Sequence, residues 1–334
     1  MEEYQSIPME RTGKILRRSI YTFFQNYQFF TTTAALLAFP FSASILLSQA
    51  LLLSSSLLPT IHFRLSSLFD AAGFPPSLEF FTILNLKLSQ TIASSIIVLP
   101  FTLSFLLFAK ASIIQALNHQ KPPLQPSFSS ILSLYNPILV TQLCNSFVII
   151  SANATCFSLL FFAFNSLDAF GYSSPNSLLF LSAIGAVLYS IVLANTIIIC
   201  NLALVSSGMD NKCGGYLAIL KACVLIRGRT ATALSLTLLV SMALAAVEAL
   251  FQYRIMRPFH QAANPTYSMA LEGMFIAYLY SILIVIETIV CVVFFKSCKM
   301  AYWVDQKSRH SYRIDIEGEA GLASANVKTI EDLP

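Results

Sequence analysis

The chain has 334 residues, of which 56% are hydrophobic and only 11% are charged. A soluble domain of this length needs roughly a quarter of its residues charged to cover its surface. Most of this surface must therefore face something other than water, and the composition excludes an ordinary soluble domain. The net charge of +4 is too small to suggest nucleic acid as a partner.

Residues 1–30 form a polar arm of mixed charge, which is not the pattern of a cleavable signal peptide. Inside this arm, apolar side chains recur at the spacing of one helix face. They are Ile15, Leu16, Ile20, Phe23, Phe24 and Tyr27. This pattern predicts an amphipathic helix that lies in the membrane interface.

Six apolar stretches follow, and each reaches the ~20 residues that a helix needs to cross ~30 Å of hydrocarbon. They are predicted at residues 31–53, 88–110, 138–164, 178–206, 231–250 and 273–295. Residues 31–295 are thus predicted to be an all-α integral membrane domain, a bundle of six transmembrane helices. Pro40 and Pro100 lie inside the first two stretches and should kink them, because proline has no backbone donor.

The distribution of basic residues predicts the orientation. Sixteen of the twenty Lys and Arg residues fall in the N-terminal arm, the second and fourth loops or the C-terminal tail, and only four in the other three loops. Because positive charge collects on the cytosolic side of membrane proteins, both termini are predicted to be cytosolic. The protein is expected in the plasma membrane or the endomembrane system. Residues 296–334, first basic and then acidic, predict a mostly disordered cytosolic tail.

The fourth loop contains a second segment that is both apolar and basic. Its apolar side chains are Tyr216, Leu217, Leu220, Val224 and Ile226. A similar segment occupies residues 128–135, before the third stretch. These segments suggest a unit of one cytosolic interfacial helix followed by a membrane hairpin, repeated three times. The alternative is that any loop entering a membrane has such a pattern.

Two segments carry a resemblance to a known family. The stretch KILRRSIYTFFQNYQFF, which begins at Lys14, resembles the start of a family of uncharacterised plant six-span membrane proteins. The block GGYLAILKACVLIRGR, residues 214–229, is similar to the most recognisable segment of that family. The matching positions are Gly215, Ala218, Lys221, Ala222, Arg227 and Gly228.

The resemblance implies a location and a shape but no established activity. Relatives usually have a Glu shortly before the glycine, where this chain has Met209-Asp210-Asn211 and thus an Asp. More distantly, the block resembles the membrane domain attached to some bacterial glycerophosphodiester phosphodiesterases. We take Gly215, Lys221, Arg227, Gly228 and Arg229 as a candidate interfacial motif on the cytosolic side.

Glu287 is the clearest candidate for a polar site inside the membrane, because it lies near the centre of the sixth stretch. A charged side chain there costs ~2.5–3.5 kcal/mol on insertion scales in the worst cases. Glu287 is either a proton or cation site, or a protonated acid hydrogen bonded to a neighbouring Asn or Ser. Cys213 and Cys298 lie beside the membrane, as palmitoylated cysteines often do, although most such cysteines are unmodified.

The sequence contains no recognisable catalytic, cofactor or metal motif. HExxH, GxSxG and P-loop patterns do not occur, and the four histidines lie far apart. The preferred hypothesis is a non-enzymatic membrane scaffold that interacts with membrane lipids or with a protein partner on the cytosolic face. The alternative is a small-solute or proton-coupled transporter or channel that uses Glu287. An intramembrane lipid enzyme is suggested only by the phosphodiesterase resemblance.

Overall fold

The computed structural model describes the backbone of residues 12–71, 79–118, 128–169, 175–210, 214–257 and 267–331. Its regular structure within these ranges is entirely helical. The α-helices are α1 (Thr12–Gln25), α2 (Tyr27–Thr33), α3 (Phe39–Ser54), α4 (Leu57–Ala71), α5 (Glu79–Phe101), α6 (Leu107–Asn118), α7 (Phe128–Ala169), α8 (Pro175–Met209), α9 (Tyr216–Ile226), α10 (Thr230–Phe251) and α12 (Tyr267–Glu331).

Among the described residues, six helical runs are long and apolar enough to cross a membrane, and each overlaps one predicted stretch. They are Tyr27–Ser48, Thr82–Asn118, Ile131–Ser166, Leu179–Met209, Thr230–Met256 and Tyr267–Trp303. The predicted helical class and number of spans therefore agree with the structure. A multi-pass integral membrane protein follows from these lengths and compositions.

Two of the three π-helical turns lie beside the prolines that the sequence analysis singled out. The turn Ala34–Ala38 joins α2 to α3 just before Pro40, and the turn Thr102–Leu106 joins α5 to α6 just after Pro100. Because proline cannot donate to the preceding helical turn, the backbone pairing changes locally. The third turn, Gln252–Met256, extends α10.

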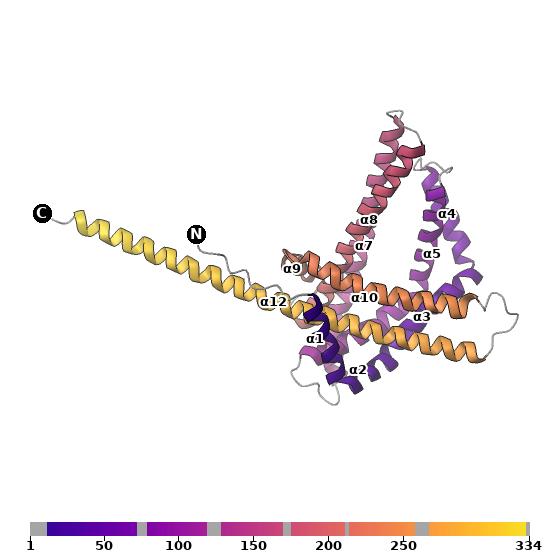
Figure 1. Cartoon of the computed structure of the whole chain (residues 1–334), viewed down its shortest axis with the longest axis horizontal. Helices are drawn as coiled ribbons and strands as arrows, with labels where there is room; N and C mark the ends of the chain where they lie inside the picture. The colour runs from indigo at the N-terminus through magenta and orange to yellow at the C-terminus, as the bar shows by residue number, and fades with distance from the viewer. Residues whose placement is uncertain are drawn as a thin grey trace.

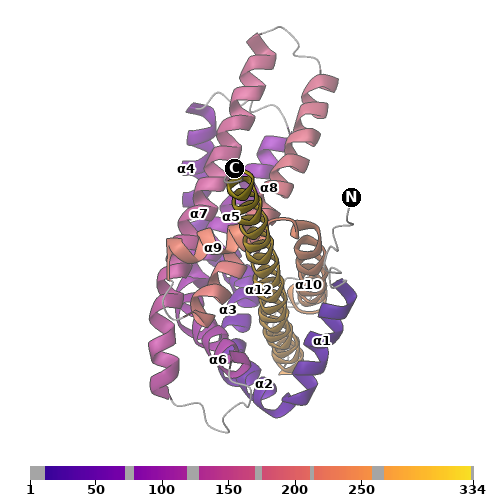
Figure 2. The ribbon, with the colours of Figure 1, turned by 90° about the vertical axis from the view of Figure 1, so that its left-hand side faces the viewer.

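The spans converge on a hub, which we define by the buried residues Ile15, Phe30, Ile113, Ala222 and Phe295. They come from α1, α2, α6, α9 and α12. From the hub, the helix pairs α4–α5, α7–α8 and α10–α12 extend in different directions, so the spans are splayed (Figures 1 and 2).

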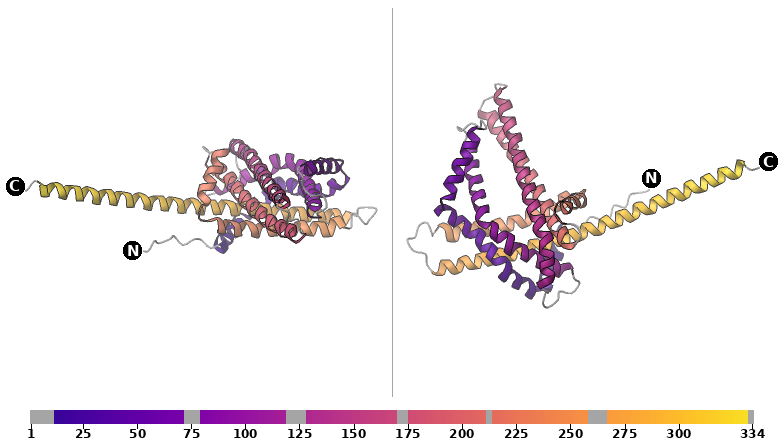
Figure 3. Two further views of the ribbon diagram at one scale, coloured as in Figure 1. Left: turned by 90° about the horizontal axis from the view of Figure 1, so that it is seen from above. Right: turned by 180° about the vertical axis from the view of Figure 1, so that it is seen from behind.

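The sixth span passes through the hub. Of its most apolar window, 61% is buried, against at most 39% in the other five spans. Figure 3 shows α12 continuing beyond the hub toward the C-terminus. Its backbone is helical through Glu331, whereas a mostly disordered tail was predicted from residue 296. The segment has no proline before residue 334, so a helix that starts in the membrane can propagate into it.

Two elements differ from the sequence interpretation. Helix α4, Leu57–Ala71, occupies what was predicted to be a loop between the first two spans. The segment 128–135 is the start of the 42-residue helix α7 and not a separate interfacial helix. Only the first and third of the predicted units therefore begin with a helix of their own, α1 and α9.

Tyr135, in α7, donates a hydrogen bond to the carbonyl oxygen of Leu103 in the second π-helical turn, at 2.7 Å. Tyr135→Phe should lower the free energy of unfolding by about 1 kcal/mol, because that carbonyl loses its donor. The ring stacking on Phe108, with centroids 4.5 Å apart, is retained in the variant. The midpoint of thermal unfolding in detergent checks this, with Tyr216→Phe, an exposed tyrosine, as the control. Equal midpoints for Tyr135→Phe and the unaltered protein would contradict the expectation.

Candidate functional site

A carboxylate shared by two lysines joins three elements at the edge of the hub. Asp210 directly follows α8, and its Oδ1 lies 2.9 Å from Lys299 Nζ of α12. Its Oδ2 contacts Lys221 Nζ of α9. The Asp210 side chain is 21% exposed, and the two lysine side chains 39% and 38%. The ion pairs are therefore only partly shielded from solvent.

Sequence reasoning placed Lys221 in an interfacial motif but left the role of Asp210 in doubt. One signal could have identified the cluster. Asp210 follows the C-terminal end of α8, where the helix dipole disfavours a negative charge. An acid in that position needs nearby cations. Lys221 is only 11 residues away, whereas Lys299, 89 residues away, could not be recognised from spacing.

Burial and charge act in opposite directions on the pKa of the Asp210 carboxyl group. Partial burial raises the pKa, but the hydrogen bonds and positive charges of Lys221 and Lys299 outweigh it. The pKa therefore lies below its ordinary value of 3.8, and the carboxylate stays ionised at neutral pH.

Gly215 lies at the start of α9 and fixes its entry. Its φ is +65°, a region that favours glycine, and its N–H donates to Thr141 Oγ1 of α7 at 2.9 Å. A Cβ on Gly215 would lie 3.3 Å from Val140 Cγ1. Glycine is thus required by the backbone conformation as well as by the close approach to α7.

The far end of α9 is a turn that leads into α10. Gly228 has a φ of +80°, a region that favours glycine, and Arg229 Nη1 donates to the carbonyl oxygen of Ser297 in α12 at 3.3 Å. Arg227 is exposed. Of the candidate motif, Gly215, Lys221 and Arg229 therefore anchor α9 to its neighbours, and Arg227 faces outward.

Helix α9 has one buried and one exposed face, and both are apolar. The buried face packs into the hub through Ala218, Ile219, Ala222, Leu225 and Ile226. The large exposed side chains, 44–63% accessible, are Tyr216, Leu217, Leu220 and Val224, and Cys223 is exposed beside them. Four of the five side chains predicted to meet the membrane are therefore exposed, and the fifth, Ile226, is buried.

Helix α1 shows the same division. Ile15 and Phe23 are buried, while the exposed apolar side chains are Ile20, Tyr21 and Phe24, followed by Tyr27 at the start of α2. Arg17 and Arg18 are exposed as well. α1 packs against α12, and its Thr12 hydroxyl lies 2.9 Å from that of Ser235 in α10. Two anchored helices thus present aromatic, aliphatic and basic groups near the hub.

Glu287 lies in α12 beside two very small cavities, of about 30 and 10 Å³. Asn201 Nδ2 of α8 is 3.5 Å from Glu287 Oε1, and Lys110 of α6 lines the smaller cavity. The structure thus brings a basic residue near Glu287, which the sequence alone did not show. Each cavity holds about one water molecule at most, so neither is a path for a solute.

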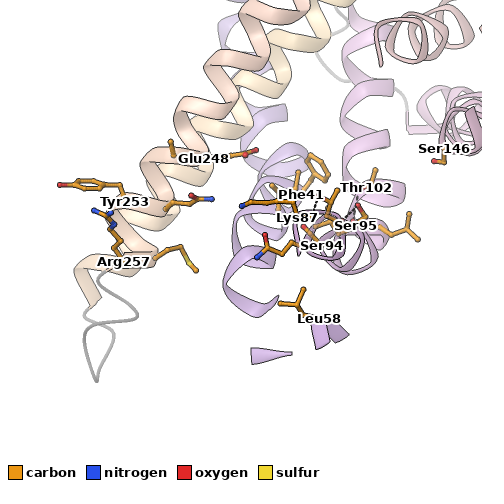
Figure 4. Close-up of a pocket in the computed structure, with 18 of the residues that line it drawn as sticks. Phe41, Leu58, Lys87, Ser94, Ser95, Thr102, Ser146, Glu248, Tyr253 and Arg257 are labelled. Carbon is orange, nitrogen blue, oxygen red and sulfur yellow. Dashed lines mark hydrogen bonds between the residues drawn. The ribbon is translucent and has the colours of Figure 1, made fainter. Parts of the chain in front are cut away.

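A much larger cleft of about 1030 Å³ lies between α3, α5, α7 and α10 (Figure 4). It shares no lining residue with the two cavities beside Glu287. Glu248 lines it, and its Oε1 accepts a hydrogen bond from the Tyr280 hydroxyl of α12 at 2.8 Å. This cleft was not predicted from the sequence, because its lining comes from helices far apart in the chain.

Of the two cysteines predicted for palmitoylation, the structure describes only Cys298. Cys213 lies outside the described residues. Cys298 is 1% exposed in the hub. Its burial does not favour acylation, which requires access to the thiol.

Residues 2–315 match the protein family described as Domain of unknown function (DUF8558). The chain belongs to this family. No curated protein and no solved structure matches it. The family description brings no activity to this DUF8558 protein, and the resemblances to plant proteins and to phosphodiesterase membrane domains stay predictions.

Asp210→Asn should lower the free energy of unfolding by about 1–2 kcal/mol at neutral pH, because Lys221 and Lys299 lose their shared anion. The low folded pKa fixes the pH dependence. The stabilisation is fully present above the ordinary pKa of 3.8 and is lost as the pH falls through the lower folded value. Thermal midpoints of this variant and the unaltered protein should therefore converge in acid.

The control for this comparison is Asp70→Asn, an exposed acid on α4. It should leave the midpoint nearly unchanged at every pH, since surface substitutions have small effects. If the thermal midpoints of Asp210→Asn and the unaltered protein move further apart as the pH falls, the prediction is wrong, because loss of the ion pairs in acid should bring them together.

Proposed function

We propose that this DUF8558 protein is a non-enzymatic membrane scaffold whose helices α1 and α9 bind lipid headgroups at the cytosolic face. The main support for this proposal is that α9 is anchored to its neighbours and still has an exposed apolar face. Asp210 and Lys221 hold its body, and Gly215 and Arg229 hold its ends. A helix fixed in this way presents its exposed face in one orientation.

The position of α9 in the chain supports an interfacial location. It begins a few residues after the fourth span ends at Met209 and ends just before the fifth begins at Thr230. Trp303, 62% exposed, ends the sixth span, and Tyr302 beside it is also exposed. Aromatic side chains collect at the headgroup level of membranes. Contiguous exposed apolar surface at that level favours contact with lipid.

The charge near the exposed faces favours anionic lipid. Arg17, Arg18 and Arg227 are exposed beside the apolar groups of α1 and α9. Basic residues near an anionic surface each contribute about 1 kcal/mol to binding. The cytosolic placement of the hub rests on the distribution of Lys and Arg along the chain. A protein partner that docks on the same face is part of this proposal.

Transport through Glu287 has less support. The cavities beside Glu287 are small, and Glu287 Oε1 accepts a hydrogen bond from Asn201 Nδ2 of the neighbouring helix α8. Because these cavities are small, the described helices around Glu287 leave no space through which a solute could pass.

Hydrogen exchange in nanodiscs tests the lipid proposal. The amides of α1 and α9 should be more protected in nanodiscs that contain anionic lipid than in purely zwitterionic ones, because bound headgroups hold both helices in the interface. Neutralising Arg17, Arg18 and Arg227 together to Gln should abolish the difference. Arg64→Gln on α4, an exposed arginine elsewhere, is the matched control. Equal protection in the two lipid mixtures would refute the proposal.

Proteoliposomes test the transport alternative. A scaffold should give no proton or cation flux above that of protein-free vesicles, and Glu287→Gln should change nothing, since glutamine keeps a carbonyl acceptor for Asn201. A flux that the unaltered protein supports and Glu287→Gln abolishes would replace the scaffold with a transporter.

A further inference from the structure

A stripe of polar side chains runs along one face of the second span. It consists of Lys87, Gln90, Thr91, Ser94, Ser95 and Thr102, all of which line the large cleft. From Lys87 to Ser95 their spacing of three and four residues places them on one side of a helix, and Thr102 follows seven residues later, beyond Val98 and Leu99 of the same lining. From Lys87 to Thr102 the stripe is about 22 Å long at ~1.5 Å per residue, which is most of the ~30 Å hydrocarbon thickness.

The hydroxyl groups of this stripe are only partly used within the protein. Thr91 and Ser95 donate to the carbonyl oxygens one turn earlier in their own helix, at 2.9 and 2.8 Å, so their oxygens can still accept. Ser94 pairs with Ser48 of α3 at 2.7 Å. A polar stripe of this length is costly against lipid tails unless water or a polar ligand group covers it.

Lys87 lies at the end of the stripe farthest from the hub. It is five residues from Thr82, where the apolar run begins, and thus near the end of the second span that is opposite the hub. Within the part of the chain that the structure describes, no ion pair involves Lys87. Figure 4 shows Lys87 extending from α5 toward α10.

The rest of the lining is partly apolar and partly polar. Phe41 and Ile45 of α3, Val98 of α5 and Met256 beyond α10 contribute apolar surface. Arg257, at the edge of the cleft, lies 5.6 Å from the centroid of the Tyr253 ring. The one carboxylate among the described residues of the lining, that of Glu248, already accepts a hydrogen bond from Tyr280. A cavity with the cation Lys87 near one end of its span and with apolar walls fits an amphiphile. Its volume is at the top of the range of roughly 300–1,000 Å³ for small-molecule pockets.

We propose that this cleft binds a glycerophospholipid from the leaflet opposite the hub. Lys87 contacts the phosphate, the hydroxyl and amide groups of α5 solvate the glycerol and ester oxygens, and the acyl chains lie on the apolar wall. The ligand is a lipid and not a soluble phosphate, because the cleft lies among membrane spans and has an apolar wall. The site shares no residue with the exposed faces of α1 and α9, so it stands or fails independently of the proposed function.

Photo-crosslinking to the full-length protein in detergent tests this site. A photoactivatable phosphatidylglycerol should label peptides of α3, α5 and α10, and excess unlabelled phosphatidylglycerol should compete. A diacylglycerol with the same chains and soluble glycerol 3-phosphate should compete at least about tenfold less well, since each lacks one half of the ligand. Labelling confined to α1 and α9 would overturn this site while leaving the proposed function intact.

Two variants locate the contacts. Lys87→Gln should weaken labelling of the cleft at least about tenfold, through loss of a charge-assisted contact. Ser95→Phe should block it by filling the cleft. Their matched controls are Arg64→Gln and Thr155→Phe. Thr155 is exposed on α7 and makes the same type of hydrogen bond to its own helix as Ser95, outside the cleft.

Thermal midpoints in detergent establish that all four variants are folded. Cleft labelling that survives both Lys87→Gln and Ser95→Phe overturns the proposal. So does competition by diacylglycerol or glycerol 3-phosphate that equals competition by phosphatidylglycerol.

Discussion

Close packing of small residues around α12 is the constraint on which the arrangement depends. Lipid tails are as apolar as leucine, so helices in a membrane gain little from burying apolar surface against each other, and close contact decides which of them associate. Val285, Ile289, Val292 and Phe295 follow one face of α12 and are fully buried. The helices α6, α8 and α9, which all contact α12, contain small residues that are at most 1% exposed, among them Ala109, Ala111, Ala203, Ser206, Ser207, Ala218 and Ala222. Away from this contact, the helix pairs are free to diverge, which leaves the large cleft between α5 and α10.

The ion pairs of Asp210 determine the orientation in which α9 packs against the hub. Helix α9 has only 11 residues, too few for a stable helix by itself, and both of its faces are apolar. Packing alone could bury either face. The pairing of Lys221 with Asp210, together with the backbone bond of Gly215 to Thr141, fixes which face enters the hub. The larger side chains, Tyr216, Leu217 and Leu220, are left outside, where a membrane interface can accept them. The ion pairs of Asp210 thus have their main effect on which face of α9 is exposed, and a smaller effect on the stability of the protein.

The number of spans could be predicted because each span is a long apolar run, and a property of consecutive residues is visible in a sequence. Contacts between segments that are far apart in the sequence could not be predicted in this way. The partner of Asp210 on α12 is 89 residues away, and the polar stripe of α5 becomes the wall of a cleft only where α10 diverges from it. The boundary of α7 was misplaced for another reason: the amphipathic segment 128–135 continues into the span without a break, although Pro137 lies at the junction. Pro137 lies inside α7, beyond its first turn, so it removes one backbone hydrogen bond without ending the helix.

The location of Glu287 supports the scaffold proposal more than its charge supports transport. An acid in the middle of a span suggests a moving proton or ion, yet Glu287 lies on α12, the most buried of the six spans. A transport cycle that exposed Glu287 alternately to each side would have to separate Val285 and Ile289 from their neighbours, and these contacts hold the other helices together. The polar surface large enough for a ligand lies elsewhere, on α5, where the helices have already diverged. The buried contacts beside Glu287 therefore support the scaffold proposal. In the cleft, by contrast, a ligand can enter without disturbing the hub.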